Sequence, residues 1–589
     1  MMIDMGRARD ILLDIPYISN TVIQEKSPYI NKGFSQGLQC NLLLKDQSVK
    51  LFIGIPNAWD RELVSIYVID FASLPFMPHV ESDGKLCLFD LEGVLIDQNF
   101  EGLLEQCIKR AKEILEKGFY SNNDSEFARE FSSYWSYQAP KRYMKFAVPE
   151  NHKTQLIKYC DPAAKLRQKK KESLASFENR KTKTEMFAAS DLSYFSLWKV
   201  PGPHLNGIFF HLEPKEYILP PDPRKKLELE YVQMLVSFVP SNTLMQWKFK
   251  ISTSTLIVFE VLEPGHEIVC FGIMLKNILL EADKEYLCVK PSSKIYEVTA
   301  IDISRIDDEF LTQRTQTNKE LQAPKVLLIG CGSIGGYLCS ELVKAGYQNL
   351  TLVDGDILKA ENIYRHLLGI DYVGKYKAEA LRTHCKYSFP QVIINTLDSN
   401  AEEMIEDGSI ELNNFDVIIS ATGNHNFNRW LNRHTYKKHI KVPCIYLWNE
   451  PLDVGCHLAI IHPENQGCYE CFFGRDTETN ELYDVTAYTK PGQIVTKSSR
   501  GCSGTFVPYS SNVSLCVVST CLEWMERLFT GRCNRNVLVS IKGDAYHFNK
   551  AGYECSDVYY AQSIKENIIE SSDFHNESCK ICGEYTDGD

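Results

Sequence analysis

A glycine-rich stretch in the second half of the chain constrains its fold more than any other part of the sequence. Residues 325–329 are apolar and typical of a buried strand, and they run directly into Gly330, Gly332 and Gly335. Glycines at this spacing allow a tight turn and let backbone N–H groups approach a phosphate at the start of the next helix. We expect that helix over residues 337–345 and a second strand over residues 349–353. The stretch therefore predicts a nucleotide-binding strand–helix–strand unit.

Charged and polar residues after the second strand distinguish ATP from a dinucleotide. Asp354 is the acidic residue that such a unit needs to bind ribose hydroxyls. Asp356, Asn362, Arg365 and Lys377 follow within one short segment. A hydride-transfer enzyme has no obvious use for this set, whereas an enzyme that transfers a phosphoryl or nucleotidyl group stabilises charge with positioned cations. The pattern favours ATP.

These elements, taken in order, resemble the ThiF/MoeB superfamily, the adenylating core of ubiquitin-activating enzymes. That family combines a Gly-rich turn, D-x-D, N-x-x-R-Q and a downstream lysine, which correspond here to the glycines, the Asp354 and Asp356 pair, Asn362 with Arg365, and Lys377. The resemblance implies a Rossmann-like adenylation domain over residues 308–589. An ordinary Rossmann domain with surface charges is the alternative, and a G-x-G-x-x-G pattern alone would not exclude it.

The resemblance also implies roles for individual residues. Asp354 would hold the ribose, while Arg365, Lys377 and Arg314 would stabilise the phosphates of ATP. The family has a second aspartate that binds Mg²⁺, and Gly423 stands at that position here. Binding of Mg²⁺ would then fall to the aspartate pair after the second strand or to an acid elsewhere, and the sequence leaves this open.

Composition bounds the class of protein. A chain of 589 residues suggests about three to five domains. Its net charge of −12 argues against a general nucleic-acid binder, which needs a basic surface. We find no signal sequence and no long apolar run, so we expect a cytoplasmic protein with no membrane contact. The 20 cysteines are scattered, and in that compartment they indicate thiols or metal ligands instead of disulfides.

The first 150 residues predict an α+β domain with a nucleophilic cysteine. Apolar strand-like segments are followed by an amphipathic helix over residues 100–117. The segment Met77-Pro-His79 and the turn at Gly84 precede Cys87, and this spacing resembles the H-P-N…C active-site region of ubiquitin-conjugating enzymes. Met77 and His79 replace the family's His and Asn. His79 could still donate a hydrogen bond to an oxyanion and lower the pKa of a nearby thiol. The alternative for Cys87 is a small buried hydrophobe.

The middle of the chain shows no catalytic pattern. Aromatic residues between 127 and 137 predict a helical hairpin that packs on the first domain. Residues 151–185 contain many lysines and arginines, and a solvated linker explains them better than an RNA contact. Residues 186–307 predict a β-rich domain that spaces or braces the two ends.

Two C-x-x-C pairs near the C-terminal end predict a structural metal site. Cys468 with Cys471 and Cys579 with Cys582 supply four thiolates, enough for a closed tetrahedral Zn²⁺ site. A closed site leaves no position for substrate, so the role is structural. MoeB-like members of the resembled family carry the same pairing.

A second nucleophile is expected between these pairs. Cys502 lies in a small polar loop beside Arg500 that leads into a helix over residues 514–528, a setting that lowers the pKa of a thiol. The resemblance places the catalytic cysteine of activating enzymes in this loop. Cys516 and Cys521 are expected in the helix core, and a structural role for Cys502 is the alternative.

The two resemblances in one chain predict a relay. ATP would adenylate a protein C-terminus, Cys502 would form a thioester, Cys87 would accept the acyl group, and an amine would attack it. This layout resembles the fused ubiquitin-transferase-like proteins of bacterial CBASS antiphage operons. That family implies a homodimer and a cGAS/DncV-like nucleotidyltransferase, or a ubiquitin-like protein, as the activated partner.

Two alternatives remain open at this point. One is sulfur-carrier activation of the ThiF/MoeB kind, in which Cys502 serves sulfur transfer and the N-terminal domain docks a partner. The other is a scaffold without catalysis, which is supported by Gly423 and Met77, the two positions that depart from the patterns of the resembled families. The sequence names neither the acceptor nor the activated terminus, and it does not say whether an arginine acts across a dimer.

Overall fold

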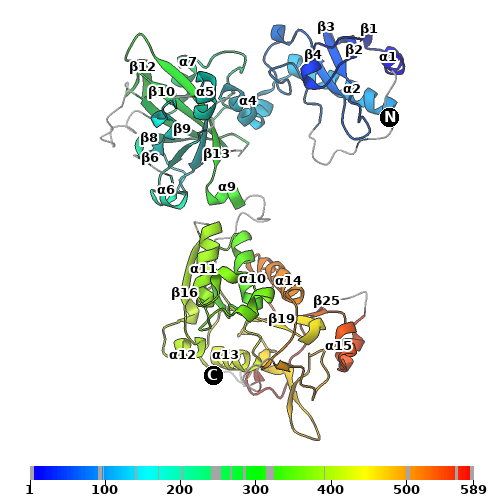
Figure 1. Ribbon diagram of the computed structural model, residues 1–589, viewed down its shortest axis with the longest axis vertical. Coiled ribbons are helices and arrows are strands. Elements are labelled where there is room, and N and C mark those ends of the chain that lie inside the picture. The colour runs from blue at the N-terminus through cyan, green and yellow to red at the C-terminus, as the bar shows by residue number, and fades with distance from the viewer. Residues whose placement is uncertain are drawn as a thin grey trace. The chain divides into compact units, whose positions relative to one another are not determined.

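The computed structural model describes residues 5–89, 96, 99–139, 142–169, 172–182, 184–200, 202, 204–240, 254–265, 268–282, 287–312, 324–389, 392–498, 505–563 and 568–583. The chain forms two compact units, residues 1–307 and 308–589, and this boundary coincides with the predicted start of the adenylation domain (Figure 1). Within the described segments, every helix is too short or too polar to cross a bilayer.

The first unit begins with a small α+β domain, as predicted. Its antiparallel sheet has the order β1-β2-β3-β4. The elements are α1 (Met5–Leu13), β1 (Ile18–Gln24), β2 (Gly37–Leu43), β3 (Ser48–Gly54), β4 (Ser65–Val68) and α2 (Phe100–Tyr120). Helix α2 buries one apolar face, which comprises Phe100, Leu103, Leu104, Cys107, Ile108, Ala111, Ile114 and Leu115. These residues recur at helical spacing, which is why the sequence predicted the helix.

Two short helices, α3 (Asp124–Arg129) and α4 (Phe131–Gln138), follow α2. They form the predicted helical pair, but its packing differs from the prediction. Trp135 Nε1–H donates to the carbonyl oxygen of Ile301, 2.9 Å away, and Phe131 and Trp135 belong to a buried cluster that they share with strands of the following barrel. Phe127 and Tyr134 instead contact Phe76 of the first domain. The pair therefore has one aromatic side on each domain, because its large rings alternate between two apolar surfaces.

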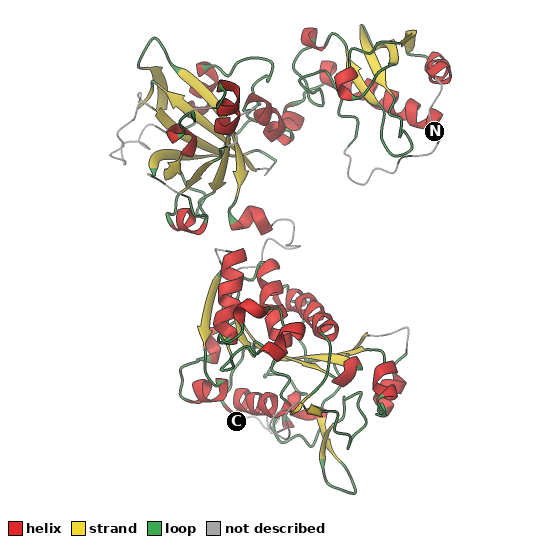
Figure 2. Cartoon of the chain, in the orientation of Figure 1, coloured by secondary structure: helices red, strands yellow, loops and turns green. Residues whose placement is uncertain are grey.

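The rest of the first unit is a closed β-barrel in the order β10-β13-β5-β7-β6-β8-β9 (Figure 2). Its strands are β5 (Tyr143–Ala147), β6 (Gln155–Cys160), β7 (Met186–Ala189), β8 (Leu205–Leu212), β9 (Ser254–Leu262), β10 (Ile268–Lys276) and β13 (Glu297–Arg305). A hairpin of β11 (Ile278–Ala282) and β12 (Leu287–Pro291) and the helices α5 (Leu174–Thr182), α6 (Ser193–Leu197) and α7 (Leu229–Ser237) accompany it. The predicted β-rich domain is thus a barrel.

The barrel includes a segment that the sequence indicated as linker. Strand β6, within residues 151–185, pairs with β7 and β8. One buried cluster draws on every barrel strand and fills the interior; it includes Met144, Ile157, Met186, Phe209, Leu256, Met274 and Ile301. The charged run conceals this strand because the lysines of the segment dominate its composition, whereas the buried residues of β6 are only Ile157, Tyr159 and Cys160.

The second unit is organised around a mixed sheet in the order β16-β15-β14-β17-β18-β19-β24-β25. Strands β14 to β18 run parallel, as predicted, and the last strands are antiparallel. The strands are β14 (Lys325–Ile329), β15 (Asn349–Val353), β16 (Ile393–Leu397), β17 (Val417–Ser420), β18 (Cys444–Asn449), β19 (Gly455–Ile461), β24 (Val537–Lys542) and β25 (Ile568–Ser571). Minor hairpins are β20 (Phe473–Arg475) with β21 (Leu482–Asp484), and β22 (Lys497–Ser498) with β23 (Thr505–Phe506).

Helices surround this sheet (Figure 1). They are α10 (Ser333–Lys344), α11 (Lys377–Ser388), α12 (Ala401–Glu406), α13 (His425–Lys437), α14 (Ser511–Phe529), α15 (Tyr546–Lys550) and α16 (Asp557–Ala561), and the short helix α9 (Asp308–Thr312) precedes them in the chain. Helix α10 begins four residues before the predicted start, at Ser333 instead of residue 337. Gly335 and Gly336 had indicated a loop there, but they lie inside the helix because close packing requires them.

Gly335 is the closest of these packing points. A Cβ atom at this position would lie 1.8 Å from the carbonyl oxygen of Gly330, whereas a Cβ at Gly332 would meet nothing within 4 Å. The turn after β14 and helix α10 therefore touch backbone to backbone, which fixes the shape of the turn.

We expect Gly335→Ala to destabilise the second unit by about 1–3 kcal/mol or more, because the new methyl group overlaps backbone that cannot move aside. Gly332→Ala is the matched control and should unfold within about 1 kcal/mol of wild type. Urea unfolding followed by circular dichroism measures both. Equal stability of the two variants would contradict the close approach of α10 to the turn.

Candidate active sites

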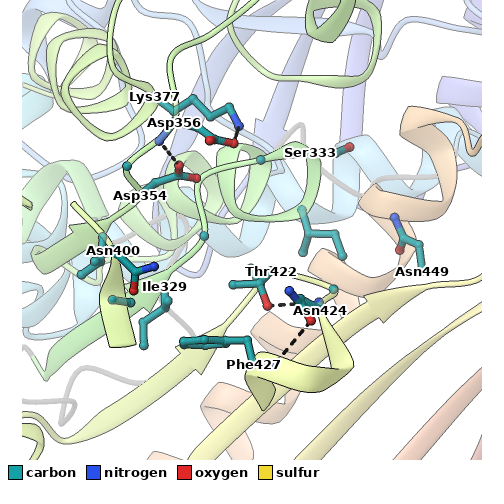
Figure 3. A pocket seen from close by; sticks show the side chains of 18 of the residues that line it. Ile329, Ser333, Asp354, Asp356, Lys377, Asn400, Thr422, Asn424, Phe427 and Asn449 are labelled. Carbon is teal, nitrogen blue, oxygen red and sulfur yellow. Dashed lines mark hydrogen bonds and ion pairs between the residues drawn. The ribbon is translucent and has the colours of Figure 1, made fainter. Parts of the chain in front are cut away.

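A pocket of about 650 Å³ lies at the carboxyl ends of the parallel strands of the second unit (Figure 3). This edge is where open α/β sheets bind ligands, and the volume suits a nucleotide. Its lining residues are Ile329, Gly330, Gly332, Ser333, Ile334, Val353, Asp354, Gly355, Asp356, Arg365, Lys377, Ser399, Asn400, Ala401, Glu402, Ala421, Thr422, Gly423, Asn424, Phe427, Asn449, Phe506, Val507 and Tyr509. Six predicted nucleotide residues, Gly330, Gly332, Asp354, Asp356, Arg365 and Lys377, thus meet in one cavity.

Asp354 connects the ends of the first two strands of the unit. Its carboxylate accepts hydrogen bonds from the backbone N–H of Cys331, at 2.6 Å, and from that of Asp356, at 2.8 Å. These bonds fix the side chain at the rim of the pocket. An acid held there is suitably placed for the hydroxyl groups of a ribose.

The turn after β14 has a second support in His366, which the sequence analysis missed. The backbone N–H of Leu368 donates to its Nδ1, 3.0 Å away, so the proton is on Nε2, which donates to the carbonyl oxygen of Cys331 at 2.7 Å. Burial lowers the pKa of His366, consistent with this neutral form. The imidazole therefore acts as a fixed brace for the Gly-rich turn.

Lys377 and Arg365 bring positive charge to the pocket. Lys377 Nζ lies 2.6 Å from Asp356 Oδ2; the lysine side chain is 11% exposed and the aspartate 76% exposed. The ammonium is thus held inside the cavity while its partner faces solvent. Because the Asp356 carboxylate remains accessible, it can bind a cation such as Mg²⁺ in place of the Lys377 ammonium. Carboxylate oxygens are preferred ligands of Mg²⁺.

Arg365 contacts the segment that follows the loop containing Cys502. Its guanidinium lies 5.2 Å from the ring centre of Tyr509, and its Nη1–H donates to the carbonyl oxygen of Val507, 3.4 Å away. A single arginine therefore borders the nucleotide pocket and contacts Val507 and Tyr509. Cys502 itself, like Arg500 and Arg314, lies outside the described residues.

Two of the predicted nucleotide residues, Asn362 and Gly335, have structural contacts outside the lining of the pocket. Asn362 Oδ1 accepts from the backbone N–H of Lys359 and caps the short helix over Ala360–Arg365, so it stabilises the segment that carries Arg365. Gly335 packs against the turn, as described above, and does not line the pocket. Both were predicted as direct cofactor contacts; neither is among the residues that line the pocket, and a direct contact of either with the cofactor stays a prediction.

Several lining residues were not predicted as cofactor contacts, because they come from other strand ends. Ser399 and Asn400 follow β16, Thr422 and Asn424 follow β17, and Asn449 ends β18. Asn449 Nδ2–H donates to Ser514 Oγ at 2.8 Å, while its buried Oδ1 has no hydrogen-bond partner among the described residues. A buried acceptor without a partner is costly, which indicates a donor from a bound ligand.

Gly423 occupies the position at which the resembled family has an acidic residue. Its φ is +63°, in the left-handed region, and a Cβ there would meet nothing within 4 Å. The pocket therefore has space for a side chain at this position, but the backbone favours glycine.

In the first unit, the predicted nucleophile Cys87 is exposed. A short loop over residues 79–87 presents it: Cys87 N–H donates to the carbonyl oxygen of His79, 2.9 Å away, and Leu86 N–H donates to Ile66 of β4. Gly84 turns this loop with φ +85°, where a Cβ would lie 2.6 Å from the carbonyl oxygen of Val68. Met77, which replaces the family's histidine, is buried in the core instead.

His79 does not act on the thiol as predicted. Its Nδ1 lies 2.7 Å from Glu130 and its Nε2 lies 3.6 Å from Glu126, both from the α3–α4 pair. The hydrogen bond that Nδ1–H of His79 donates to the Glu130 carboxylate raises the pKa of His79. The imidazole is thus bound to two carboxylates, and what His79 offers to Cys87 is its backbone carbonyl group.

The environment of Cys87 raises the pKa of its thiol to about 12, first through desolvation and then through Glu81. Sγ–H donates to Glu81 Oε1 at 3.6 Å. The expected lowering of the pKa by His79 was therefore wrong: the nearest charge is negative, and the thiol keeps its proton near neutral pH. Deprotonation must accompany any attack by Cys87, and Glu81 is the group placed to accept the proton.

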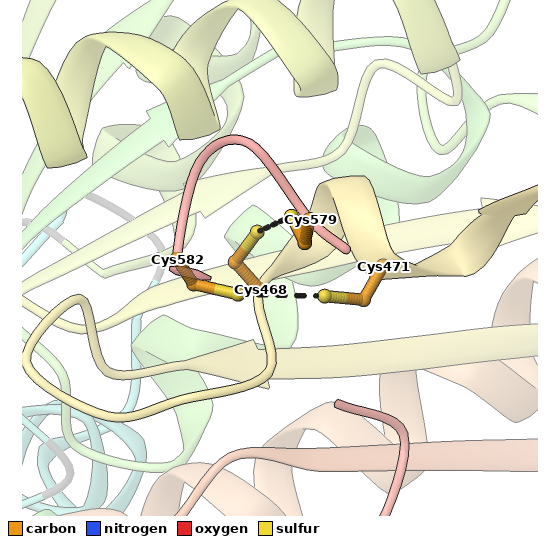
Figure 4. Close-up of side chains that lie close together, drawn as sticks. All are labelled: Cys468, Cys471, Cys579 and Cys582. Carbon is orange, nitrogen blue, oxygen red and sulfur yellow. Dashed lines mark hydrogen bonds between the residues drawn. The ribbon is translucent and has the colours of Figure 1, made fainter. Parts of the chain in front are cut away.

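The four thiols of Cys468, Cys471, Cys579 and Cys582 come together in the second unit (Figure 4). All four are buried, and their sulfur atoms lie within 4.8 Å of one another. Cys468 and Cys579 are 3.7 Å apart, and Cys471 and Cys582 are 3.5 Å apart. Zn–S bonds of about 2.3 Å in a tetrahedron put sulfur atoms about 3.8 Å apart. The cluster therefore fits a tetrahedral metal ion.

The remaining thiols of helix α14 differ from the prediction in one respect. Cys521 is buried, as expected, but Cys516 is exposed. Residues five apart are about 140° apart around a helix of 3.6 residues per turn, so the two cannot share one face.

Two protein families match the regions that contain the nucleotide pocket and Cys87. The ThiF family matches residues 304–563, and the prokaryotic E2 family B matches residues 24–144. The ATP-dependent ubiquitin transferase-like protein Cap2 of Pseudomonas aeruginosa is 31% identical over 269 residues, which cover 44% of this chain and 47% of that protein. Molybdopterin-synthase adenylyltransferase of Haemophilus influenzae is 30% identical over 128 residues, which cover 22% and 51%. The chain therefore joins a ThiF domain to an E2-family domain.

The aligned segments span less than half of the length of each Cap2 relative. Among solved structures, E. coli MccB with ATP has a TM-score of 0.32 and 19% identity, covering 46% of this chain and 70% of that one.

We expect alkylation of Cys87 by iodoacetamide to rise roughly tenfold per pH unit from about pH 7 to pH 10, because thiolate is the reactive form and a pKa of about 12 keeps it scarce. Glu81→Gln removes the nearby negative charge and should speed the reaction several-fold at each pH. Mass spectrometry of the Cys87 peptide measures the rates. Glu62→Gln, an exposed site in the same domain, is the control; a plateau near pH 9 in wild type would contradict the raised pKa.

Proposed function

We propose that this chain is an ATP-dependent transferase that activates the C-terminal carboxylate of a protein and conjugates it to an amine. The carboxylate attacks the α-phosphate of ATP, pyrophosphate leaves, and an acyl-adenylate forms. Asp354 binds the ribose, Lys377 and Arg365 offset the charge on the phosphates, and Asp356 holds Mg²⁺. Fixed cations are the main catalytic device in this kind of transfer.

The second part of the proposal is a thioester relay. The thiolate of Cys502 attacks the acyl carbon and AMP leaves. The thiol of Cys87 then displaces Cys502, with its proton passing to Glu81, which lies within reach of Sγ. Finally an amine attacks the Cys87 thioester, and the thiol is released. His79 is assigned a positioning role in this scheme, because its carbonyl oxygen accepts from the backbone N–H of Cys87.

One observation carries this proposal. An exposed thiol at Cys87, in a domain of the E2 family, occurs in the same chain as a ThiF pocket lined by Arg365 and Lys377. Adenylation alone requires only the second unit, so sulfur-carrier activation would leave the Cys87 loop without a purpose. The likeness to a molybdopterin-synthase adenylyltransferase is limited to 22% of the chain.

The partner is also part of the proposal. The likeness to Cap2 supports a role in CBASS antiphage defence, with the C-terminus of a cGAS/DncV-like nucleotidyltransferase, or of a ubiquitin-like protein, as the activated group. We further propose that the enzyme works in the cytoplasm as a homodimer, where Arg314 could contribute to the pocket.

We propose Zn²⁺ as the ion of the four-thiol cluster. Cys468, Cys471, Cys579 and Cys582 form a closed, buried donor set of soft ligands, which suits zinc. Such an ion would join the tail of the chain to the segment that follows β19 and would stabilise the second unit without taking part in the chemistry.

With ATP and the partner protein, we expect two thiol-sensitive adducts on non-reducing gels. Cys502→Ala should abolish both, because it removes the first carrier, whereas Cys87→Ala should leave the adduct on Cys502 intact. Both variants should still release pyrophosphate, since adenylation precedes the thiol steps. Cys270→Ala is a control that should behave as wild type.

Three outcomes would contradict the relay in different ways. Pyrophosphate release without any adduct would mean adenylation alone. A mass increase on the carrier equal to sulfur for oxygen would mean thiocarboxylate formation, as in sulfur-carrier activation. No pyrophosphate and no adduct with wild-type protein would mean that the chain is a scaffold.

We expect Cys582→Ser to lose one zinc ion per chain and to melt several degrees below wild type, because a structural zinc site contributes directly to folding. Elemental analysis by plasma mass spectrometry and a thermal scan measure both. Cys533→Ser, at another buried thiol of the second unit, should keep the metal. Unchanged zinc in Cys582→Ser would refute the assignment.

A further inference from the structure

A second group of metal-binding side chains lies in the barrel of the first unit. The ligand atoms of His152, His211 and Glu260 all lie within 4.8 Å of one another. Nδ1 of His211 is 2.7 Å from the Glu260 carboxylate, and Nδ1 of His152 is 3.0 Å from the same group. Two imidazoles thus present the same ring nitrogen to one carboxylate.

The barrel strands explain why these side chains converge. His211 of β8 and Glu260 of β9 are direct partners in the sheet. Each is two residues from a side chain of the interior cluster, Phe209 and Val258, so both point into the barrel. Glu260 is completely buried. A carboxylate in an apolar interior is costly unless cations or metal ions compensate it, and two histidines are the groups aimed at it.

His152 reaches the site from the connection between β5 and β6. Its φ of +45° lies in the left-handed region, which is unfavourable for a residue with a Cβ. Its N–H donates to the carbonyl oxygen of Pro149, 2.9 Å away, which closes the turn. The strained backbone aims the imidazole at Glu260, and backbone strain of this kind is concentrated at functional sites. The side chain is 33% exposed, which leaves a path from solvent.

Glu213 binds the second ring nitrogen of His211, the one that does not face Glu260. Its carboxylate lies 3.1 Å from Nε2 of His211, on the far side of the ring from Glu260. A metal-bound histidine commonly donates its other N–H to a carboxylate, which fixes the ring and its tautomer. Nearby, Arg305 is paired bidentately with Asp307, at 2.7 and 3.0 Å, so its charge is already compensated by that aspartate.

We propose that His152, His211 and Glu260 bind a divalent first-row transition-metal ion. Ligand atoms at about 2.1 Å from such an ion, with bonds at right angles, lie about 3.0 Å apart, close to the separations of 2.7 to 3.1 Å found here. Two histidines and one carboxylate suit Zn²⁺ or Fe²⁺ and leave coordination positions for water. The site is independent of the thiol cluster and of the adenylation pocket.

Co²⁺ binding to the full-length protein tests this proposal. Equilibrium dialysis with elemental analysis should show that His211→Gln and His152→Gln each bind one Co²⁺ per chain fewer than wild type. Glu213→Gln should weaken this site about 10- to 100-fold without removing it, as expected for a residue that supports a ligand. His204→Gln, an exposed histidine of the same barrel, should bind as wild type.

The absorption spectrum separates this site from the thiol cluster, because only Co²⁺ bound by cysteine gives intense thiolate charge-transfer bands. The band lost in His211→Gln should be free of them. Equal Co²⁺ content in wild type, His211→Gln and His152→Gln, with all proteins folded by circular dichroism, would overturn the proposal and leave a buried hydrogen-bonded trio. If His211→Gln fails to fold, the comparison of His152→Gln with wild type decides the question, because the His152 side chain is partly exposed.

Discussion

The bond between Asp354 and the backbone of Cys331 is the interaction on which the adenylation site depends. It joins the end of one parallel strand to the turn after its neighbour, and His366 supports the same turn from the other side. Because both supports act on backbone atoms, the glycine turn keeps its shape without side chains of its own. The cations that border the cavity, Lys377 and Arg365, are then positioned relative to a fixed floor. A nucleotide would enter a site that is already formed.

In the E2-family domain, a helix pair outside the sheet holds the reactive loop. There the reactive loop is held by a separate element: Glu130, from the pair of helices that also packs on the barrel, binds the imidazole and the backbone of His79. The loop that carries Cys87 is therefore sensitive to how the barrel and the first domain pack within their unit. The same environment keeps the thiol protonated, so that reactivity requires a base such as Glu81. The low intrinsic reactivity would limit side reactions of a thiol that is exposed to solvent.

Linear motifs allowed much of this to be predicted. Asp354, Asp356, Arg365 and Lys377 lie in one short segment, and the four cysteines form two compact pairs, so local spacing was sufficient to find them. Asn449 and Thr422 come from other strand ends, and only the rule that ligands bind at that edge of the sheet could have indicated them. Glu130 is 51 residues from His79, and the effect of such a distant carboxylate on an imidazole is a tertiary property. Strand β6 was missed because the lysines of the surrounding segment concealed its few buried residues. The loop of Cys502 stays a prediction.

The four-thiol cluster has a consequence for the order in which the second unit is completed. Cys468 and Cys579 are 111 residues apart, and the segment between them includes helix α14 and the loop of Cys502. During synthesis, that entire segment must leave the ribosome before the last two sulfur atoms can meet the first two. A nascent chain would therefore contain strands β14 to β19 of the adenylation sheet well before it can close the four-thiol cluster, and β24 and β25 would join the sheet shortly before the last two cysteines appear.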